Sequence, residues 1–216
     1  MIKSIAEAKA VFESLNKNHV KYGVARNYDF LLQNRVYEGK DIDVVALGKD
    51  KNRVHSILIK HGFGKVPINP FSKKVLYGKY VAEDKKVLLF HFHLDGITGR
   101  HTRYLDAEPI LSRRVKKSFF YVPASEDEFL AILLHNVLDL NHVRDTYRQK
   151  LSQMVKGLDM LYVRENLYSL FSEKQTDLIL KYVSNKNYTA LESLMPSLKR
   201  RFVCAHPFKI STVFIG

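Results

Sequence analysis

The chain has 216 residues, of which 46% are hydrophobic and 26% charged, and its formal net charge is +13. This composition is typical of an ordinary soluble globular protein. No apolar run approaches the roughly 18 residues needed to span a bilayer, and the N-terminus lacks the apolar segment of a signal peptide. The single cysteine, Cys204, excludes an internal disulfide framework and a cysteine-rich zinc site. We therefore expect a cytoplasmic protein without a membrane span.

The positive charge is scattered along the chain, and the larger part of the excess lies in the first 115 residues. A basic surface attracts phosphates, whether they belong to a nucleotide, a nucleic acid or an anionic lipid. The same pattern also suits a solvated basic surface that binds no ligand. The charge alone leaves both interpretations open.

The first part of the chain alternates helical and strand patterns. Ser4 and Glu7 form a capping-box pattern, which predicts that Ser4 caps the first helix. The predicted elements, in chain order, are a helix to about residue 18, strands at 20–25 and 41–47, a helix at 50–61, and a hairpin of strands at 75–82 and 86–94. Polar residues up to Gly39 predict a loop before the second strand, and residues 63–74 are expected to be mostly loop.

The second part of the chain is predicted to be helical. Ser125, followed by Glu126, Asp127 and Glu128, is a strong helix start with acidic residues in the first turn. Residues 141–198 predict three or four further helices and no strand. The fold class is therefore α+β, with a mixed α/β domain at residues 1–118 and a helical domain at 119–216 that ends in a short strand.

The stretch from Gly39 to Leu47 places Asp41 and Asp43 two residues apart at the start of an apolar strand. Alternate strand residues share a face, so the two Cα atoms would lie about 6.5–7 Å apart on one side of the sheet. Two carboxylates in this arrangement suit a hard cation such as Mg²⁺. They also suit a solvated strand start without a metal.

The strand at 86–94 carries His91 and His93 on one face, and Asp95 follows on the same parity. Two imidazoles and a carboxylate on one strand face could share a Zn²⁺ ion. The alternative, which we favour, is that both histidines are half-buried strand residues beside the acids. His135 and His142 read as structural or surface residues, and Cys204 has no adjacent base that would make it a nucleophile.

Two segments resemble conserved patterns of the nucleotidyltransferase fold of the DNA polymerase β superfamily, in particular of its small prokaryotic members. They are Tyr22-Gly23-Val24-Ala25-Arg26-Asn27-Tyr28 and Gly39-Lys40-Asp41-Ile42-Asp43. The helix start at 122–128 and Leu133-Leu134-His135 are similar to the helical extension of that group. The resemblance covers most of residues 1–150 and implies transfer of a nucleotidyl group from an NTP to an acceptor that the sequence does not identify.

The resemblance also implies roles for individual residues. Asp41 and Asp43 would hold Mg²⁺ against the triphosphate, and Asp95 would be the third carboxylate of a two-metal site. Residues implied to bind substrate are Arg26, Gly39, Lys40, Arg144 and Arg148. Arg26 and Lys40 would neutralise the phosphates, while Arg144 and Arg148 lie one turn apart on a predicted helix and could reach the nucleotide.

One departure from the family pattern supports a second hypothesis. The Gly-Ser helix start typical of active members is absent, and Ala25-Arg26-Asn27 stands in its place. A catalytically degenerate module that binds a nucleotide, RNA or a protein partner is therefore the alternative to an enzyme. Some members of this group are fused to thymidylate-kinase-like domains, and the apolar tail at 210–215 followed by Gly216 is similar to a strand that enters a P-loop.

Overall fold

The computed structural model describes residues 2–26, 28–35, 41–68, 74–99 and 102–207. The chain divides into two compact units, one formed by Met1–Ile97 with Leu105–Ala124 and the other by Thr98–Tyr104 with Ser125–Gly216. This division falls after Ala124, a few residues beyond the domain boundary expected from sequence. The predicted C-terminal strand at 210–215 lies outside the described residues.

The first unit contains a mixed sheet flanked by helices, as the sequence predicts. Its main elements are α1 (Lys3–Lys17), β1 (Tyr22–Val24), α2 (Asp29–Leu32), β2 (Asp41–Ala46), α3 (Lys51–Lys60), β3 (Gly64–Val66), β4 (Lys74–Val81), β5 (Lys86–Leu94), α4 (Ala107–Ser112), β8 (Val115–Lys117) and β9 (Phe120–Val122). Strands β6 (Gly96–Thr98) and β7 (Arg103–Asp106) form a separate two-stranded sheet.

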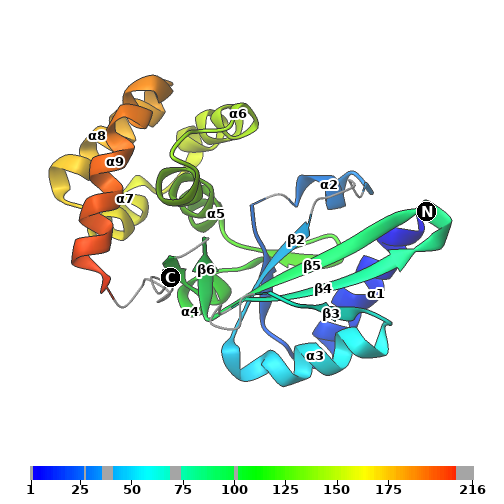
Figure 1. Ribbon diagram of the computed structural model, residues 1–216. Helices are drawn as coiled ribbons and strands as arrows, with labels where there is room; N and C mark the ends of the chain where they lie inside the picture. The colour runs from blue at the N-terminus through cyan, green and yellow to red at the C-terminus, as the bar shows by residue number, and fades with distance from the viewer. Residues whose placement is uncertain (1, 27, 36–40, 69–73, 100–101, 208–216) are drawn as a thin grey trace. The chain divides into compact units, whose positions relative to one another are not determined.

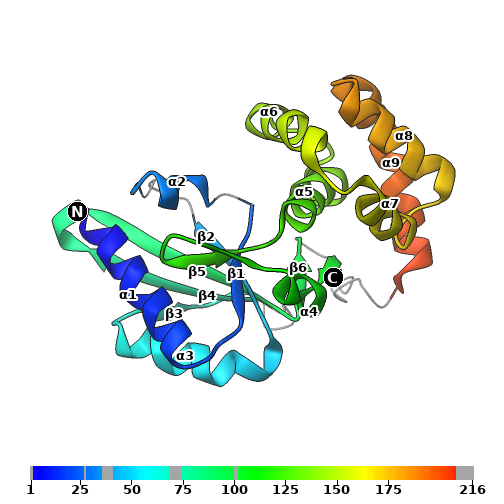
Figure 2. The ribbon, with the colours of Figure 1, turned by 180° about the vertical axis from the view of Figure 1, so that it is seen from behind.

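The five-stranded sheet has the order β1-β2-β5-β4-β3. Strands β2 and β5 are parallel, and every other neighbouring pair is antiparallel. Helices α1 and α3 both cover one face of this sheet (Figures 1 and 2). The core on that face contains Ile42 and Val44 of β2 and Phe90 and Phe92 of β5. Side chains alternate along a strand, so Asp43, between Ile42 and Val44, and His91, between Phe90 and Phe92, point to the opposite face.

The N-terminus of α1 is capped differently from the prediction. Ser4 lies inside the helix and is buried, and it does not act as the N-cap. Its amide and hydroxyl donate to Asp84 Oδ2 at 2.6 and 2.5 Å, while the Lys3 amide donates to Asp84 Oδ1 at 3.3 Å. The carboxylate that satisfies the helix N-terminus thus comes from the turn between β4 and β5. A local capping-box pattern cannot reveal a cap supplied from so far along the chain.

Four short elements occupy segments that were not predicted from the sequence as regular structure. Helix α2 lies in the expected polar loop, β3 adds an edge strand within 63–74, and β8 and β9 form a hairpin before the helical region. Helix α3 agrees with its prediction: Val54, Ile57 and Leu58 are buried, and Gly62 follows the helix with φ of +79°.

The second unit is helical from Ser125 onward within the described residues. Its helices are α5 (Ser125–Leu134), a π-helix at His135–Leu140, α6 (Asp145–Met154), α7 (Met160–Tyr168), α8 (Glu173–Ser184) and α9 (Tyr188–Ala205). Helix α8 carries a capping box between Ser172 and Gln175. No helix of the described chain combines the length and apolar character required to cross a membrane.

Candidate functional site

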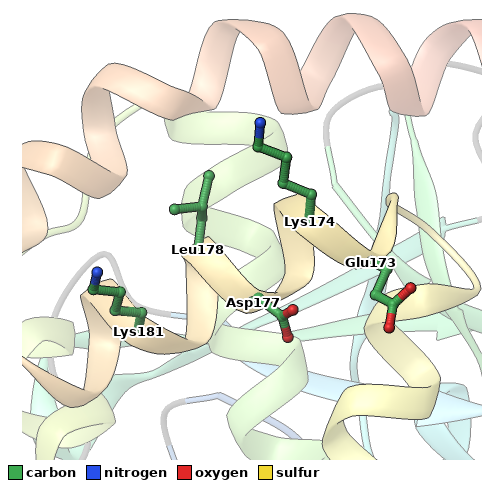
Figure 3. A pocket seen from close by; sticks show the side chains of 5 residues that line it. All are labelled: Glu173, Lys174, Asp177, Leu178 and Lys181. Carbon is green, nitrogen blue, oxygen red and sulfur yellow. The ribbon is translucent and has the colours of Figure 1, made fainter.

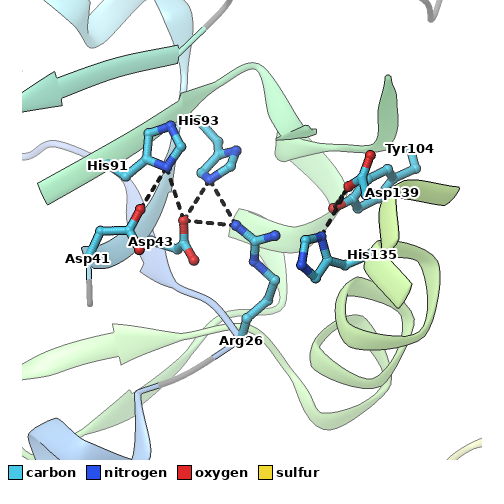
Figure 4. Close-up of polar contacts among 8 residues, drawn as sticks. All are labelled: Arg26, Asp41, Asp43, His91, His93, Tyr104, His135 and Asp139. Atoms are coloured by element: carbon cyan, nitrogen blue, oxygen red, sulfur yellow. Dashed lines mark hydrogen bonds and ion pairs between the residues drawn. The ribbon is translucent and has the colours of Figure 1, made fainter. Parts of the chain in front are cut away.

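A cluster of charged side chains lies on the face of β2 and β5 opposite the core. The parallel register pairs Asp43 with His91, so the two acids of β2 lie beside the two histidines of β5. His91 Nδ1 is 3.0 Å from Asp41 Oδ2 and 3.3 Å from Asp43 Oδ1, and His93 Nε2 is 2.9 Å from Asp43 Oδ1. Figure 4 shows the four side chains converging from the two strands.

Arg26 completes this cluster from the end of β1. Its Nη2 lies 2.8 Å from Asp43 Oδ1 and 3.2 Å from His93 Nε2, and the residue is only 6% exposed. Its φ of 70° is in the left-handed region, which is uncommon for a residue with a long side chain. The Ala25 amide donates to the Asp43 carbonyl at 3.0 Å and ties this segment to β2. The guanidinium is therefore held as a permanent positive charge inside the cluster.

The cluster shifts the protonation of its members in different directions. Burial raises the pKa of Asp43, but Arg26 and the hydrogen bonds of His91 and His93 outweigh it and hold that pKa well below its usual value. Burial lowers the pKa of His93 to about 3, against the opposing contact with Asp43. Burial also opposes a charge on His91, but its hydrogen bonds to Asp41 and Asp43 raise its pKa. At neutral pH the buried part of the cluster thus contains ionised Asp43 and neutral His93.

The structure does not bring Asp95, the predicted third metal-binding carboxylate, into the group formed by Asp43, His91 and His93. Strand β5 ends at Leu94, and Asp95 turns away with φ of 64°. Its Oδ1 accepts a hydrogen bond of 2.7 Å from the Gly48 amide, in the turn after β2. Side chains alternate between the two faces only where the backbone is extended. The expectation that Asp95 shares a face with His91 and His93 therefore does not hold. His91, not an acid, is the β5 residue beside both Asp41 and Asp43.

Apart from Arg26, the residues predicted to bind substrate are not found in this cluster within the described chain. Gly39 and Lys40 lie outside the described residues. Arg144 precedes α6 as its N-cap, with an extended backbone, so it does not share a helical face with Arg148. Arg148 Nη2 pairs with Glu192 at 2.8 Å within the second unit.

Arg148 also borders a cavity of about 610 Å³ in the second unit, together with Lys156, Lys186 and Tyr188. A second cavity, of about 370 Å³, is lined by one face of α8 (Figure 3). Its lining residues include Lys174 and Asp177, and Asp177 pairs with Arg164. This mixture of charges fits a solvated helix face. The cavity on α8 therefore offers no chemistry of its own.

The second unit holds its own polar cluster on the π-helix. His135 Nδ1 is 3.0 Å from Asp139 Oδ2, and the Tyr104 hydroxyl donates to the same oxygen at 3.4 Å (Figure 4). Gly99 lies against this carboxylate, because a Cβ at that position would be 1.8 Å from Asp139 Oδ2. His135 is therefore a side-chain partner of Asp139, where the sequence predicted only a structural or surface residue. His142 is exposed, and so is Cys204.

Within the described chain, Asp43, His91 and His93 form a group whose donor atoms all lie within 4.8 Å of one another and could hold a metal ion. Asp41 adjoins this group through His91. The donor set is two carboxylates and two imidazoles, in place of the three carboxylates expected from the resemblance. Its nitrogen atoms suit a transition metal better than Mg²⁺.

No protein-family model matches the chain, and no curated protein matches it. Among solved structures, it is similar to the solution structure of the antibiotic-resistance factor ANT(2'')-Ia, whose conformational dynamics are described as substrate-regulated. The TM-score is 0.42 and the identity 13%, over 90% of this chain and 98% of that chain. A similarity of this size assigns no function, so the functional argument depends on the site.

Proposed function

We propose that this chain is a nucleotide-binding domain of the nucleotidyltransferase type, related to the DNA polymerase β superfamily. In this proposal it binds a nucleoside triphosphate with one divalent cation at Asp41 and Asp43. The observation that carries the proposal is the pairing of these carboxylates on one face of β2, with the Asp41 side chain 40% exposed and that of Asp43 10% exposed. Asp41 is thus the group that an approaching phosphate-bound cation can reach.

In this proposal the two carboxylates hold one Mg²⁺ ion and not two. Mg²⁺ prefers oxygen ligands and is commonly held by one or two carboxylates together with substrate phosphates, while it keeps several waters. Asp41 and Asp43 meet that requirement. A second Mg²⁺ would need another carboxylate, but Asp95 lies against Gly48 and His91 presents a nitrogen instead. When bound, the ion would neutralise phosphate charge and orient the triphosphate.

The protein's own residues would supply the remaining electrostatics. Asp41 and Asp43 place negative charge where the cation is needed, and Arg26 holds Asp43 ionised inside the site. The excess positive charge of the chain favours the approach of a polyanion. These features support binding of a nucleotide without requiring that it reacts. A cytoplasmic location belongs to the same proposal.

A second candidate function is nucleotidyl transfer to an acceptor, which the original resemblance implies. The observation in its favour is that His91 lies beside both carboxylates, on the β5 position adjacent to Asp43. His91 would then take the place of the third acid beside the reacting groups. The acceptor is unidentified, and RNA or protein partners belong to the binding proposal.

The proposal is tested by thermal shift with each of the four NTPs, with and without Mg²⁺. A ligand that binds only the folded chain at 100 times its Kd stabilises it by about 2.7 kcal/mol. We expect a shift that requires Mg²⁺ and disappears in the Asp41→Asn, Asp43→Asn double variant. Asp95→Asn is the matched control, because it removes a nearby carboxylate that the structure places outside the site. An equal shift in the double variant would contradict the proposal.

Transfer is tested separately by following pyrophosphate release from the NTP that binds. Release by the wild-type chain that is lost in His91→Ala, while NTP binding persists, would support the second candidate. Binding without release would leave the binding function alone.

A further inference from the structure

The buried side of the cluster has the donors of a transition-metal site. Asp43 Oδ1 is 2.9 Å from His93 Nε2 and 3.3 Å from His91 Nδ1. In a tetrahedral site with bonds of about 2.0–2.2 Å, ligand atoms lie roughly 3.4 Å apart. The two distances from Asp43 are already close to that spacing. One carboxylate and two imidazoles form a donor set that suits Zn²⁺, Co²⁺ or Mn²⁺.

Arg26 contacts two of the same three donors. Its Nη2 is 2.8 Å from Asp43 Oδ1 and 3.2 Å from His93 Nε2. A metal ion bound to these atoms would lie within a few ångströms of the guanidinium, which carries a permanent positive charge. Two cations that contact the same donor atoms repel each other strongly. Solvent screens this repulsion only weakly, because the His93 side chain is 1% exposed.

We infer that Asp43, His91 and His93 form a binding site for a divalent transition-metal ion, and that the Arg26 guanidinium competes with that ion for the same donors. Arg26 thereby sets the metal affinity of the chain. This inference goes beyond the proposed function, which places a phosphate-bound Mg²⁺ on Asp41 and Asp43. The two sites share Asp43, but the transition-metal site also uses His91 and His93 and requires no nucleotide.

The test compares Co²⁺ binding by wild type and by Arg26→Met, a neutral substitution of similar length. Co²⁺ is the probe because a site with imidazole ligands changes its visible absorption spectrum. Removing a unit charge this close to the ion should tighten Co²⁺ binding by on the order of 100-fold or more. Adding His93→Ala to Arg26→Met should weaken it again, since one nitrogen ligand is lost. Mg²⁺, which prefers oxygen, should show no comparable gain.

Arg53→Met is the matched control. Arg53 also pairs with an aspartate, through Nη1 to Asp50 Oδ1 at 2.9 Å in the same unit, but no histidine belongs to that pair. Its loss should leave Co²⁺ affinity unchanged. Equal Co²⁺ affinity in wild type and Arg26→Met would overturn the inference, and so would a gain that persists after His93 is removed.

Arg26→Met could unfold, because Asp43 loses its buried partner. In that case the measurement is the refolding yield in Co²⁺ against the yield in Mg²⁺. We expect recovery only in Co²⁺, and equal yields would overturn the inference. The outcome is independent of NTP binding: Co²⁺ titrations can follow the expected order while the thermal shift with NTPs fails, and the reverse can also occur.

Discussion

Two histidine–aspartate pairs in this molecule have the same contact distance and different surroundings. His91 lies 3.0 Å from Asp41, and His135 lies 3.0 Å from Asp139 (Figure 4). The first pair joins two strands from segments 50 residues apart, whereas the second joins positions i and i+4 of a single helical segment. Asp43 and Arg26 adjoin the first pair, and a tyrosine hydroxyl adjoins the second.

Because the two contacts have equal lengths, we expect any difference in their energies to come from the charges around them. The strand cluster contains a guanidinium and an ionised carboxylate, both nearly buried, so each requires the other. The π-helix pair involves one carboxylate that receives hydrogen bonds from His135 and Tyr104. Replacing one charged residue should therefore lower the free energy of unfolding much more in the strand cluster than in the π-helix pair.

The largest effect is expected for Arg26→Met, which leaves the Asp43 carboxylate buried without its cation. Breaking a buried ion pair from one side typically costs about 3–5 kcal/mol. Urea denaturation would measure the loss, with Arg53→Met as the exposed-pair control at about 1 kcal/mol or less. Adding Asp43→Asn should recover part of the loss, because the two sites are coupled. A loss as small as that of the control would show that the strand cluster resembles the π-helix pair.

The next effect is a loss of stability in acid caused by His93. Its pKa is about 3 in the folded chain and about 6.5 when unfolded, so between these values only the unfolded chain binds the proton. Stability should fall as pH drops below about 6.5, by up to roughly 1.4 kcal/mol per pH unit. Urea denaturation of the metal-free chain over this range should show a steeper slope for wild type than for His93→Gln.

The two neighbours of His93 act in other pH windows. The contribution of His91, whose pKa is raised, is fully present below its unfolded pKa and is lost as pH rises through the folded value. The contribution of Asp43, whose pKa is lowered, is present above its unfolded value and is lost in stronger acid. Equal slopes for wild type and His93→Gln between about pH 4.5 and 6 would therefore contradict a neutral, buried His93.

A smaller effect is expected for Gly99→Ala in the second unit. The added Cβ would lie 1.8 Å from Asp139 Oδ2, so the carboxylate or the backbone must shift. Overpacking of this kind costs about 1–3 kcal/mol. The cost should be smaller when Asp139→Ala is also present, because the clashing carboxylate is then absent. A thermal-unfolding cycle of the two single variants and the double variant measures this coupling, and additive effects would argue against the close approach.

The smallest effect is expected for Asp139→Asn, which keeps the shape and removes the charge beside His135. The histidine side chain is 18% exposed and the pair is local, so a loss of about 0.5–1.5 kcal/mol is expected. Urea denaturation would compare it with Asp43→Asn, which removes the partner of a buried guanidinium. If Asp139→Asn were the more damaging of the two, the contrast between the clusters would be wrong.

Local patterns predicted much of the fold. The strand beginning at Asp41, the hairpin of β4 and β5, and the helix ending before Gly62 follow from alternation, helical spacing and turn residues, and the structure agrees. Short elements such as β3 and β8 were missed because each has only three residues, and pairing with a neighbouring strand stabilises them more than their own residues do. Asp84 as the cap of α1 was missed for a different reason, since it is distant in sequence from the helix that it caps.

The site was predicted only in part. Asp41, Asp43 and Arg26 were all selected from a strand pattern and an upstream segment, and the structure brings Arg26 to Asp43. The metal and phosphate roles expected for them stay predictions. Asp95 was selected by parity, which fails where the backbone turns left-handed after Leu94. His91 and His93 were placed beside the acids as the favoured interpretation, but their contact with Arg26 could not be derived from spacing.

The sequence alone determined which side chains share a strand face, since alternation depends only on position along an extended chain. It therefore placed Asp41 with Asp43, and His91 with His93. Only the tertiary structure decided that β2 and β5 are parallel neighbours with Asp43 opposite His91, and that Arg26 extends from β1 into this group. The register of two strands and the burial of a guanidinium are both set by packing between segments that are distant in sequence. The balance of charges in the site follows from these two features.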